Sequence, residues 1–251
     1  MKLAVIFSVL ICCCFACKEN ETINNPTTET TSIEIGNADA KSDALANEIL
    51  AAMGGQEKWD NTNYISWTFF GSRKLVWDKL NGRARIESPR DTSLYLVDLN
   101  TSEGKYFKNG NQILDTSVVN KKMKQAISIW INDSYWLAMP FKLRDPGVNL
   151  RYVREDTISE GVDASVLELT FNDVGNTPNN KYEVYVDHKD NLIKKWSFFK
   201  SANQTDPPRS WPWDNYQNFD GLLLSTDRSD KSGPSEVKVY NVMDDKVFEE
   251  F

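Results

Sequence analysis

Cysteine and histidine are almost absent from most of this 251-residue chain. The four cysteines occupy positions 12, 13, 14 and 17, and His188 is the one histidine. Residues 18–251 therefore lack the thiols needed for a disulfide, a cysteine nucleophile or an iron–sulfur cluster. A single imidazole also leaves too few ligands for an ordinary zinc or haem site. We predict no metal and no cofactor.

Nucleotide motifs and basic clusters are missing as well. Neither G-x-x-x-x-G-K-[ST] nor G-x-G-x-x-G occurs in the sequence. The formal net charge is −7 at pH 7, and the densest basic stretch, residues 121–124, has the pattern of a solvated helix face. A chain this acidic is not expected to bind nucleic acid through its net field.

Long hydrophobic runs are limited to the first residues. The apolar stretch 3–16 follows Lys2 and ends at Ala16-Cys17. Its length is below the roughly 20 residues that a helix needs to span a bilayer, so a permanent membrane anchor is the weaker interpretation. The layout resembles a bacterial lipoprotein signal peptide, which is cleaved before a cysteine that becomes acylated.

Cys17 fits the modified position better than the other cysteines, because the preceding Ala16 is small. Cys14 departs from the usual pattern, in which Leu, Val or Ile stands three residues before the cleavage point. We predict a signal peptide at 1–17 and lipidation of Cys17, for example with palmitate, which would attach the protein to a membrane. Cleavage would remove Lys2 and change the net charge to −8.

The residues after Cys17 bear on location. Residue 18 is Lys, whereas Asp there resembles a signal for inner-membrane retention, and the stretch 18–21 resembles the short Lys-plus-acidic export tags of Bacteroidota surface lipoproteins. We predict the outer membrane and leave the leaflet open. Residues 18–42 are polar and without hydrophobic period, which predicts a flexible tether. Residues 43–251 then form one domain.

The hydrophobic period along the domain predicts an α+β fold. A helix is expected from Ser42 or Asp43 to the pair Gly54-Gly55. Further helices are expected around 119–131 and at 135–139, stopped by Pro140. Strands are expected at 64–70, 73–79, 83–88, 93–99, 105–107, 112–114, 149–154, 165–171, 181–186, 192–200, 221–227 and 236–244. This order indicates one large curved antiparallel sheet covered by a few helices.

Side chains that could support catalysis are few. His188 lies in a polar segment between two predicted strands, so we place it at a hairpin tip, which is unfavourable for a Ser-His-Asp triad. Carboxylates are plentiful, and a glycosidase that uses two of them across a cleft stays open. The aromatic cluster 211–219 would stack sugar rings, hold a lipid tail, or cover the open edge of the sheet.

Three stretches together resemble a LolA-like domain, the fold of lipoprotein carriers and related lipid-handling lipoproteins. They are 49–55 with Trp59, 136–147, and 213–216 leading into Gly221-Leu222. The nearest likeness is to lipid-anchored members common in Bacteroidota. The resemblance implies an incomplete antiparallel β-barrel with helices as a lid over a hydrophobic cavity. It also implies binding of an acyl chain or another apolar ligand.

We therefore predict a non-enzymatic, membrane-anchored lipoprotein that binds an apolar ligand such as a lipid. Two alternatives stay open: a surface glycan-binding module or hydrolase, and a structural or assembly lipoprotein whose barrel is filled. Protein partners are unknown. The candidates for lining the cavity are bulky apolar side chains of the first strands and the central helices, each of which would otherwise be ordinary core. They are Trp67, Phe69, Leu75, Trp77, Trp130 and Trp136.

Overall fold

The first helix, α1 (Ala40–Ala52), begins at a side-chain cap. In the computed structural model, which describes residues 36–230 and 232–251, the Asp39 carboxylate accepts hydrogen bonds from the backbone N–H groups of Lys41 and Ser42. The helix starts two residues before the predicted Ser42, because Asp39 is the cap and the Ser42 hydroxyl donates to the backbone oxygens of Asp39 and Leu150. The predicted signal peptide, Cys17 and most of the predicted tether lie outside the described residues.

A seven-stranded antiparallel sheet follows the short helix α2 (Gln56–Asp60). Its strand order is β14-β1-β2-β3-β4-β5-β6, so the last strand of the chain pairs with the first. The members are β1 (Tyr64–Phe69), β2 (Arg73–Asp78), β3 (Arg83–Ser88), β4 (Ser93–Asp98), β5 (Gly104–Lys108), β6 (Asn111–Gln112) and β14 (Pro234–Tyr240). The strand period of two and the Asn81-Gly82 turn indicated this meander in the sequence.

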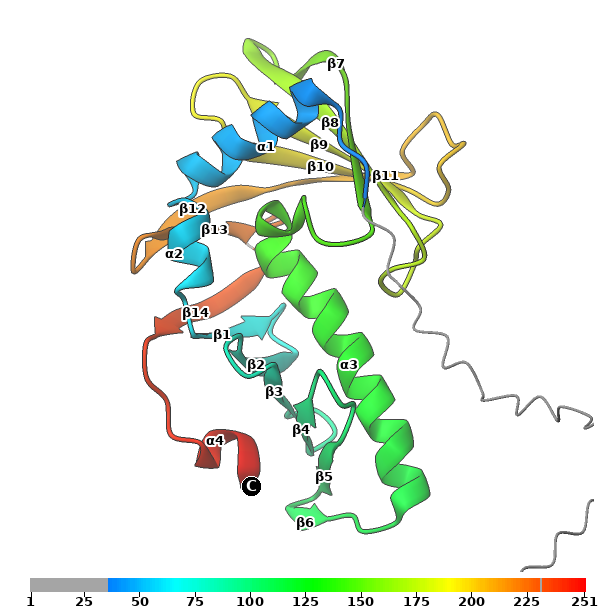
Figure 1. Ribbon diagram of the computed structural model, residues 1–251, viewed down its shortest axis with the longest axis vertical. Helices are drawn as coiled ribbons and strands as arrows, with labels where there is room; N and C mark the ends of the chain where they lie inside the picture. Colours follow the sequence, from blue (N-terminus) through cyan, green and yellow to red (C-terminus); the bar gives the residue numbers. More distant parts are fainter. Residues whose placement is uncertain (1–35, 231) are drawn as a thin grey trace, which may run out of the picture. The chain divides into compact units, whose positions relative to one another are not determined.

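One long helix, α3 (Thr116–Ala138), runs along the seven-stranded sheet and contacts β3, β4 and β5 (Figure 1). Asp115 caps its start by accepting from the N–H of Val118. The predicted break between two helices near residue 132 is wrong. The polar residue Asp133 fits inside a continuous helix because Arg73 binds its carboxylate. The helix ends in a 3₁₀ turn, η1 (Met139–Lys142), which accommodates Pro140.

A second antiparallel sheet has the strand order β11-β10-β9-β8-β7, and α1 packs against β7. Its strands are β7 (Val148–Ser159), β8 (Val162–Phe171), β9 (Lys181–Asp187), β10 (Ile193–Phe199) and β11 (Arg209–Pro212). A two-stranded ribbon, β12 (Asp214–Phe219) and β13 (Leu222–Asp227), contacts both β10 and β14. A short helix, α4 (Lys246–Glu249), lies near the C-terminus.

The predicted α+β class with large antiparallel sheets and a few helices is confirmed. The backbone hydrogen bonds divide the strands among three sheets, and the strands do not close into a barrel. Two strands of the aromatic segment, β11 and β12, were missing from the sequence prediction. Their high content of Pro, Asn and Asp is typical of loops, and they form strands here because β10 and β13 provide backbone partners.

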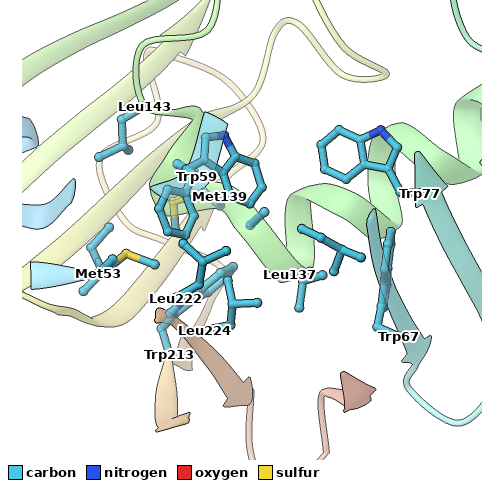
Figure 2. Close-up of a cluster of buried hydrophobic side chains, with 14 of the residues drawn as sticks. Met53, Trp59, Trp67, Trp77, Leu137, Met139, Leu143, Trp213, Leu222 and Leu224 are labelled. Carbon is cyan, nitrogen blue, oxygen red and sulfur yellow. The ribbon is translucent and has the colours of Figure 1, made fainter. Parts of the chain in front are cut away.

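The main hydrophobic core lies where α3 meets the sheets, and Figure 2 shows part of it. Trp67, Leu75 and Trp77 of the first two strands belong to this core, together with Trp213, Leu222 and Leu224 of the ribbon. Trp59 stacks on Phe141 with ring centroids 4.3 Å apart. Within the described part of the chain, no helix combines the length and the apolar character that crossing a membrane requires.

Candidate functional site

A cavity of about 520 Å³ lies between the C-terminal half of α3 and the five-stranded sheet. Its third side is the segment between β8 and β9, residues 172–180. Most of the side chains that line it are aromatic or aliphatic, and this composition suits an apolar ligand. Exposed residues such as Asn132, Asn176 and Thr177 also line it, so the cavity reaches the protein surface on that side.

The helical wall consists of successive positions near the end of α3. Trp130, Tyr135 and Trp136 all line the cavity. Trp136 is the centre of an aromatic cluster: its ring centroid lies 4.9 Å from that of Trp196 and 5.6 Å from that of Trp211. Edge-to-face pairs at these distances favour a fixed ring orientation, so this wall is preorganised.

The sheet wall follows from strand register. Phe198 is paired with Tyr182 on β9, and Trp196 is paired with Trp211 on β11. Directly opposed residues of an antiparallel pair share a face of the sheet, and Trp196 and Phe198 share a face because they are two apart. All four side chains therefore project toward α3, and all four line the cavity.

The segment 172–180 is connected to both walls. The Asn176 Nδ2 donates a hydrogen bond of 2.8 Å to the backbone oxygen of Ser128 on α3. Val174 approaches the backbone of Gly147 so closely that a Cβ there would lie 2.5 Å from the Val174 Cγ1. Gly147 also has a φ of +82°, which favours glycine. These contacts set where the segment covers the cavity.

Three buried polar atoms on residues of the cavity wall have no hydrogen-bond partner within residues 36–230 and 232–251. They are the indole nitrogens of Trp130 and Trp196 and the hydroxyl of Tyr135. Burial raises the pKa of Tyr135 well above its ordinary value, so the phenol stays protonated. Unpaired buried donors cost stability unless a ligand or water satisfies them. The cavity wall therefore contains three donors without partners among the described residues, in otherwise apolar surroundings.

A second, smaller cavity of about 260 Å³ adjoins the first. Trp136 and Trp211 line both cavities, so their rings form the shared wall. Phe69 and Phe70 at the end of β1 and Arg228 after β13 complete the smaller space, with Ser229. Phe70 meets Trp136 edge to face at 5.6 Å.

The residues predicted from the sequence to line a cavity fall into two groups. Trp130 and Trp136 line the larger cavity, and Phe69 lines the smaller one. Trp67, Leu75 and Trp77 line neither and pack in the core, where the Trp77 ring meets that of Trp130 at 5.3 Å.

Sequence reasoning missed most of the sheet wall, namely Tyr182, Trp196 and Phe198, and singled out Trp211 only as part of the aromatic cluster 211–219. The alternation of Trp196 and Phe198 was a visible signal in the sequence. Nothing in it showed that this face turns toward α3.

His188 lies in the turn between β9 and β10, as predicted. Its Nε2 is 3.1 Å from the Ser165 Oγ and 2.9 Å from the Glu155 Oε2. The acid and the hydroxyl thus share one ring nitrogen, whereas a catalytic triad needs them on opposite nitrogens. Glu155 also accepts from Tyr152 and Lys41, and these hydrogen bonds, that of Tyr152 foremost, lower its pKa to about 2. The arrangement therefore fits a surface hydrogen-bond network better than a hydrolase.

The aromatic segment 211–219 does not form an exposed platform. Trp213 is 1% exposed, Trp211 lines the cavities, and the Tyr216 hydroxyl donates to the backbone oxygen of Ile193. Stacking of sugar rings would need exposed aromatic faces. Within the described ranges, no three His, Cys, Asp or Glu side chains gather in a way that could bind a metal ion.

Comparison with known proteins shows similarity at the level of structure. No family model matches the chain, and no curated protein matches it. A DUF1329 family protein from Desulfovibrio piger is 12% identical, with a TM-score of 0.44 over 83% of this chain and 97% of that one. The LolA superfamily protein NE2245 from Nitrosomonas europaea is 15% identical, with a TM-score of 0.38 over the same shares.

MucB is 17% identical, with a TM-score of 0.27, and the match covers 66% of this chain and 55% of MucB. The chain is thus distantly similar in structure to LolA superfamily, DUF1329 and MucB proteins. These structures include a LolA superfamily protein, the group that the sequence resembles, and the likeness to Bacteroidota members stays a prediction.

Proposed function

We propose that this domain binds an apolar ligand, a lipid or an acyl chain, in the larger cavity and catalyses no reaction on it. The observation that carries this proposal is the cavity of about 520 Å³ between the aromatic face of β9, β10 and β11 and the C-terminal half of α3. Cavities of roughly 300–1,000 Å³ are typical of small-molecule sites, and apolar cavities favour apolar guests over water.

The composition of the wall supports a hydrocarbon ligand. Trp136, Trp196 and Phe198 present ring faces and edges, and the polar groups nearby are single donors such as the Tyr135 hydroxyl. A chain of methylene groups gains about 0.8 kcal/mol for each one removed from water, without needing a directional partner. The same cavity speaks against the alternative of a filled structural barrel.

Membrane attachment through Cys17 and location at the outer membrane remain part of the proposal. Sequence pattern alone supports them: the apolar run, Ala16, and the absence of Asp at position 18. The predicted tether, residues 18–42, would have a reach of roughly 25–30 Å as a flexible coil of about 25 residues. Such an anchored domain would exchange its ligand close to the bilayer and would not shuttle freely.

Native mass spectrometry and a fluorescent fatty-acid probe test the binding function. We expect purified protein to retain a lipid of discrete mass, and the probe to compete with it and to quench tryptophan emission through Trp136 and Trp196. Absence of both a retained lipid and probe binding would show that the cavity does not take an apolar ligand.

Two matched variants locate the binding. Phe198 and Phe219 are both half-buried phenylalanines on strands, but only Phe198 lines the cavity. We expect Phe198→Asp to abolish probe binding, because it places a charge in the apolar space, and Phe219→Asp to retain it. Phe198→Tyr keeps the ring and should bind nearly as well as the wild type. Equal binding by both aspartate variants would place the ligand elsewhere.

A further inference from the structure

Arg228 is a buried cation without a carboxylate partner in residues 36–230 and 232–251. It follows β13, and 1% of its surface is exposed. Its guanidinium carbon lies 3.4 Å from the centroid of the Trp213 ring. The Arg228 Nη1 donates to the Ser225 Oγ and to the backbone oxygen of Asp227, and Nη2 donates to the backbone oxygens of Trp136 and Ser225. All of these acceptors are neutral.

The nearest acid does not neutralise this charge. The Asp227 carboxylate accepts from the backbone N–H of Ser229 at 2.9 Å and forms no ion pair with Arg228 among the described residues, and its Coulombic effect on the Arg228 pKa is smaller than that of burial. The Arg228 Nε is buried and has no acceptor in the described residues. Other strongly buried charges of this chain do have partners: Asp133 binds Arg73, and Asp78 binds Arg83. Arg228 is thus an exception to the pattern within its own protein.

An unpaired buried charge is costly to fold around. Burial lowers the pKa of Arg228 to about 9, which leaves the side chain protonated at neutral pH. The protein therefore maintains a desolvated positive charge at a position that lines the smaller cavity. In such surroundings an anion gains more from a guanidinium than it would in water, because solvent screens the pair little.

The smaller cavity adjoins the proposed binding site. Trp136 and Trp211 line both spaces, so a ligand whose polar end lies beside Arg228 would pass these two rings to place its hydrocarbon end in the larger cavity. The positive charge of Arg228 therefore lies next to the smaller cavity, and the larger apolar cavity lies beyond Trp136 and Trp211.

We infer that Arg228 binds the anionic headgroup of an amphiphilic ligand, an assignment that rests on the proposed function of the larger cavity. The shared chemistry is a single negatively charged oxygen group, a carboxylate or a phosphate monoester, at the end of a hydrocarbon chain. The guanidinium would donate from Nε, its one N–H without an acceptor in the described part of the chain, to an oxygen of that group, and its positive charge would attract the anion.

Four ligands of equal chain length test this inference on the wild-type, full-length protein. Titration calorimetry at pH 7.5, below micellar concentrations, would compare dodecanoate, dodecyl phosphate, dodecanol and dodecyltrimethylammonium. We expect one or both anions to bind about 10- to 100-fold more tightly than the alcohol, the gain typical of a hydrogen bond to a charged group. The cation should bind most weakly. Whichever anion binds more tightly identifies a fatty-acid or a phosphate headgroup.

Three variants test whether the preference for anions over the alcohol depends on Arg228. Arg228→Met should bind acid and alcohol equally, and Arg228→Lys should keep part of the preference because it keeps the charge. Arg90→Met is the control, since Arg90 is exposed in the turn between β3 and β4 and lines neither cavity. Its preference should equal that of the wild type.

The outcomes separate the two proposals. Equal affinity of the wild type for dodecanoate, dodecyl phosphate and dodecanol overturns the headgroup assignment and leaves the apolar site standing. Tighter binding of the cation overturns it as well. Binding of none of the four ligands overturns the apolar site and the headgroup assignment together. Because these comparisons use the wild type, they hold even where Arg228→Met fails to fold.

Discussion

The guanidinium of Arg73 on β2 donates two parallel hydrogen bonds, each 2.8 Å long, to the carboxylate of Asp133 on α3. Asp133 is fully buried, and burial raises its pKa although Arg73 opposes that effect. The pair joins the seven-stranded sheet to the helix that forms one wall of the cavity. Such a pair is weak evidence for net stability, but it fixes the position of the helix relative to the strand.

We expect Arg73→Leu to lower the free energy of unfolding by about 3–5 kcal/mol, because it leaves the Asp133 carboxylate buried without a cation and with only the Asn132 amide as a side-chain donor. The matched control is Arg151→Leu, which removes an arginine whose side chain is 64% exposed and pairs with Glu168. That change should cost less than about 1 kcal/mol. Urea denaturation of both variants gives the comparison. The double variant Arg73→Leu/Asp133→Leu should regain most of the loss, and a failure to do so would contradict this account.

The network around Glu155 gives a prediction for acid pH. Hydrogen bonds from Tyr152, Ser165, Lys41 and His188 lower the folded-state pKa of Glu155 to about 2 from 4.5. A lowered carboxyl pKa contributes stability above pH 4.5, and this contribution disappears as the pH falls toward 2. The side chain is 54% exposed, so we expect less than about 1 kcal/mol in all.

Thermal unfolding of the wild type and of Glu155→Gln between pH 7 and pH 2 measures this contribution. The difference in Tm should be largest at pH 5–7 and should vanish near pH 2. Glu160→Gln in the exposed turn between β7 and β8 is the control and should show no such trend. A Tm difference that grows as the pH falls would have the opposite sign to the one expected.

Gly147 tests how the segment 172–180 is set over the cavity. Gly147→Ala would add backbone strain at a φ of +82° and a contact of 2.5 Å with Val174. Gly161→Ala has a similar φ of +75° but open space around it, so it measures the strain alone, about 1 kcal/mol. We expect Gly147→Ala to lose more stability and to weaken binding of the fatty-acid probe. Restored binding in Gly147→Ala/Val174→Ala would attribute the effect to the contact, whereas equal losses for the two glycine variants would exclude it.

The sequence was sufficient to predict most helices and strands, but it was insufficient to predict which residues line the cavity. The alternation of apolar and polar residues predicted most strands of the two larger sheets. Ile65 and Trp67, for example, are two residues apart and therefore share a face of their strand. The cavity wall was only half predicted, because which face of β10 turns toward α3 depends on where the helix packs. That position depends on the pair of Arg73 and Asp133, 60 residues apart in the chain. Arg228 was likewise invisible as an isolated charge, because burial is a property of the folded chain.

Trp136 separates the two cavities, so its replacement should change which chain lengths the protein accepts. Its ring lines both spaces and contacts Trp196, Trp211 and Phe70. Trp136→Leu removes much of that wall and should join the cavities into one longer space. We expect affinity in a series of n-alkanols from eight to sixteen carbons to peak at a longer chain than in the wild type. The variant should also lose about 2–4 kcal/mol of stability, as large-to-small core changes do.

Trp59→Leu provides the control for this shift. Trp59 is buried and stacks on Phe141, and it lines neither cavity. It should lose comparable stability without changing the preferred chain length. Because both variants are destabilised, a shift confined to Trp136→Leu cannot come from general loosening of the fold. An unchanged preferred chain length in Trp136→Leu would mean that a ligand never passes this wall. The larger and the smaller cavity would then be separate sites.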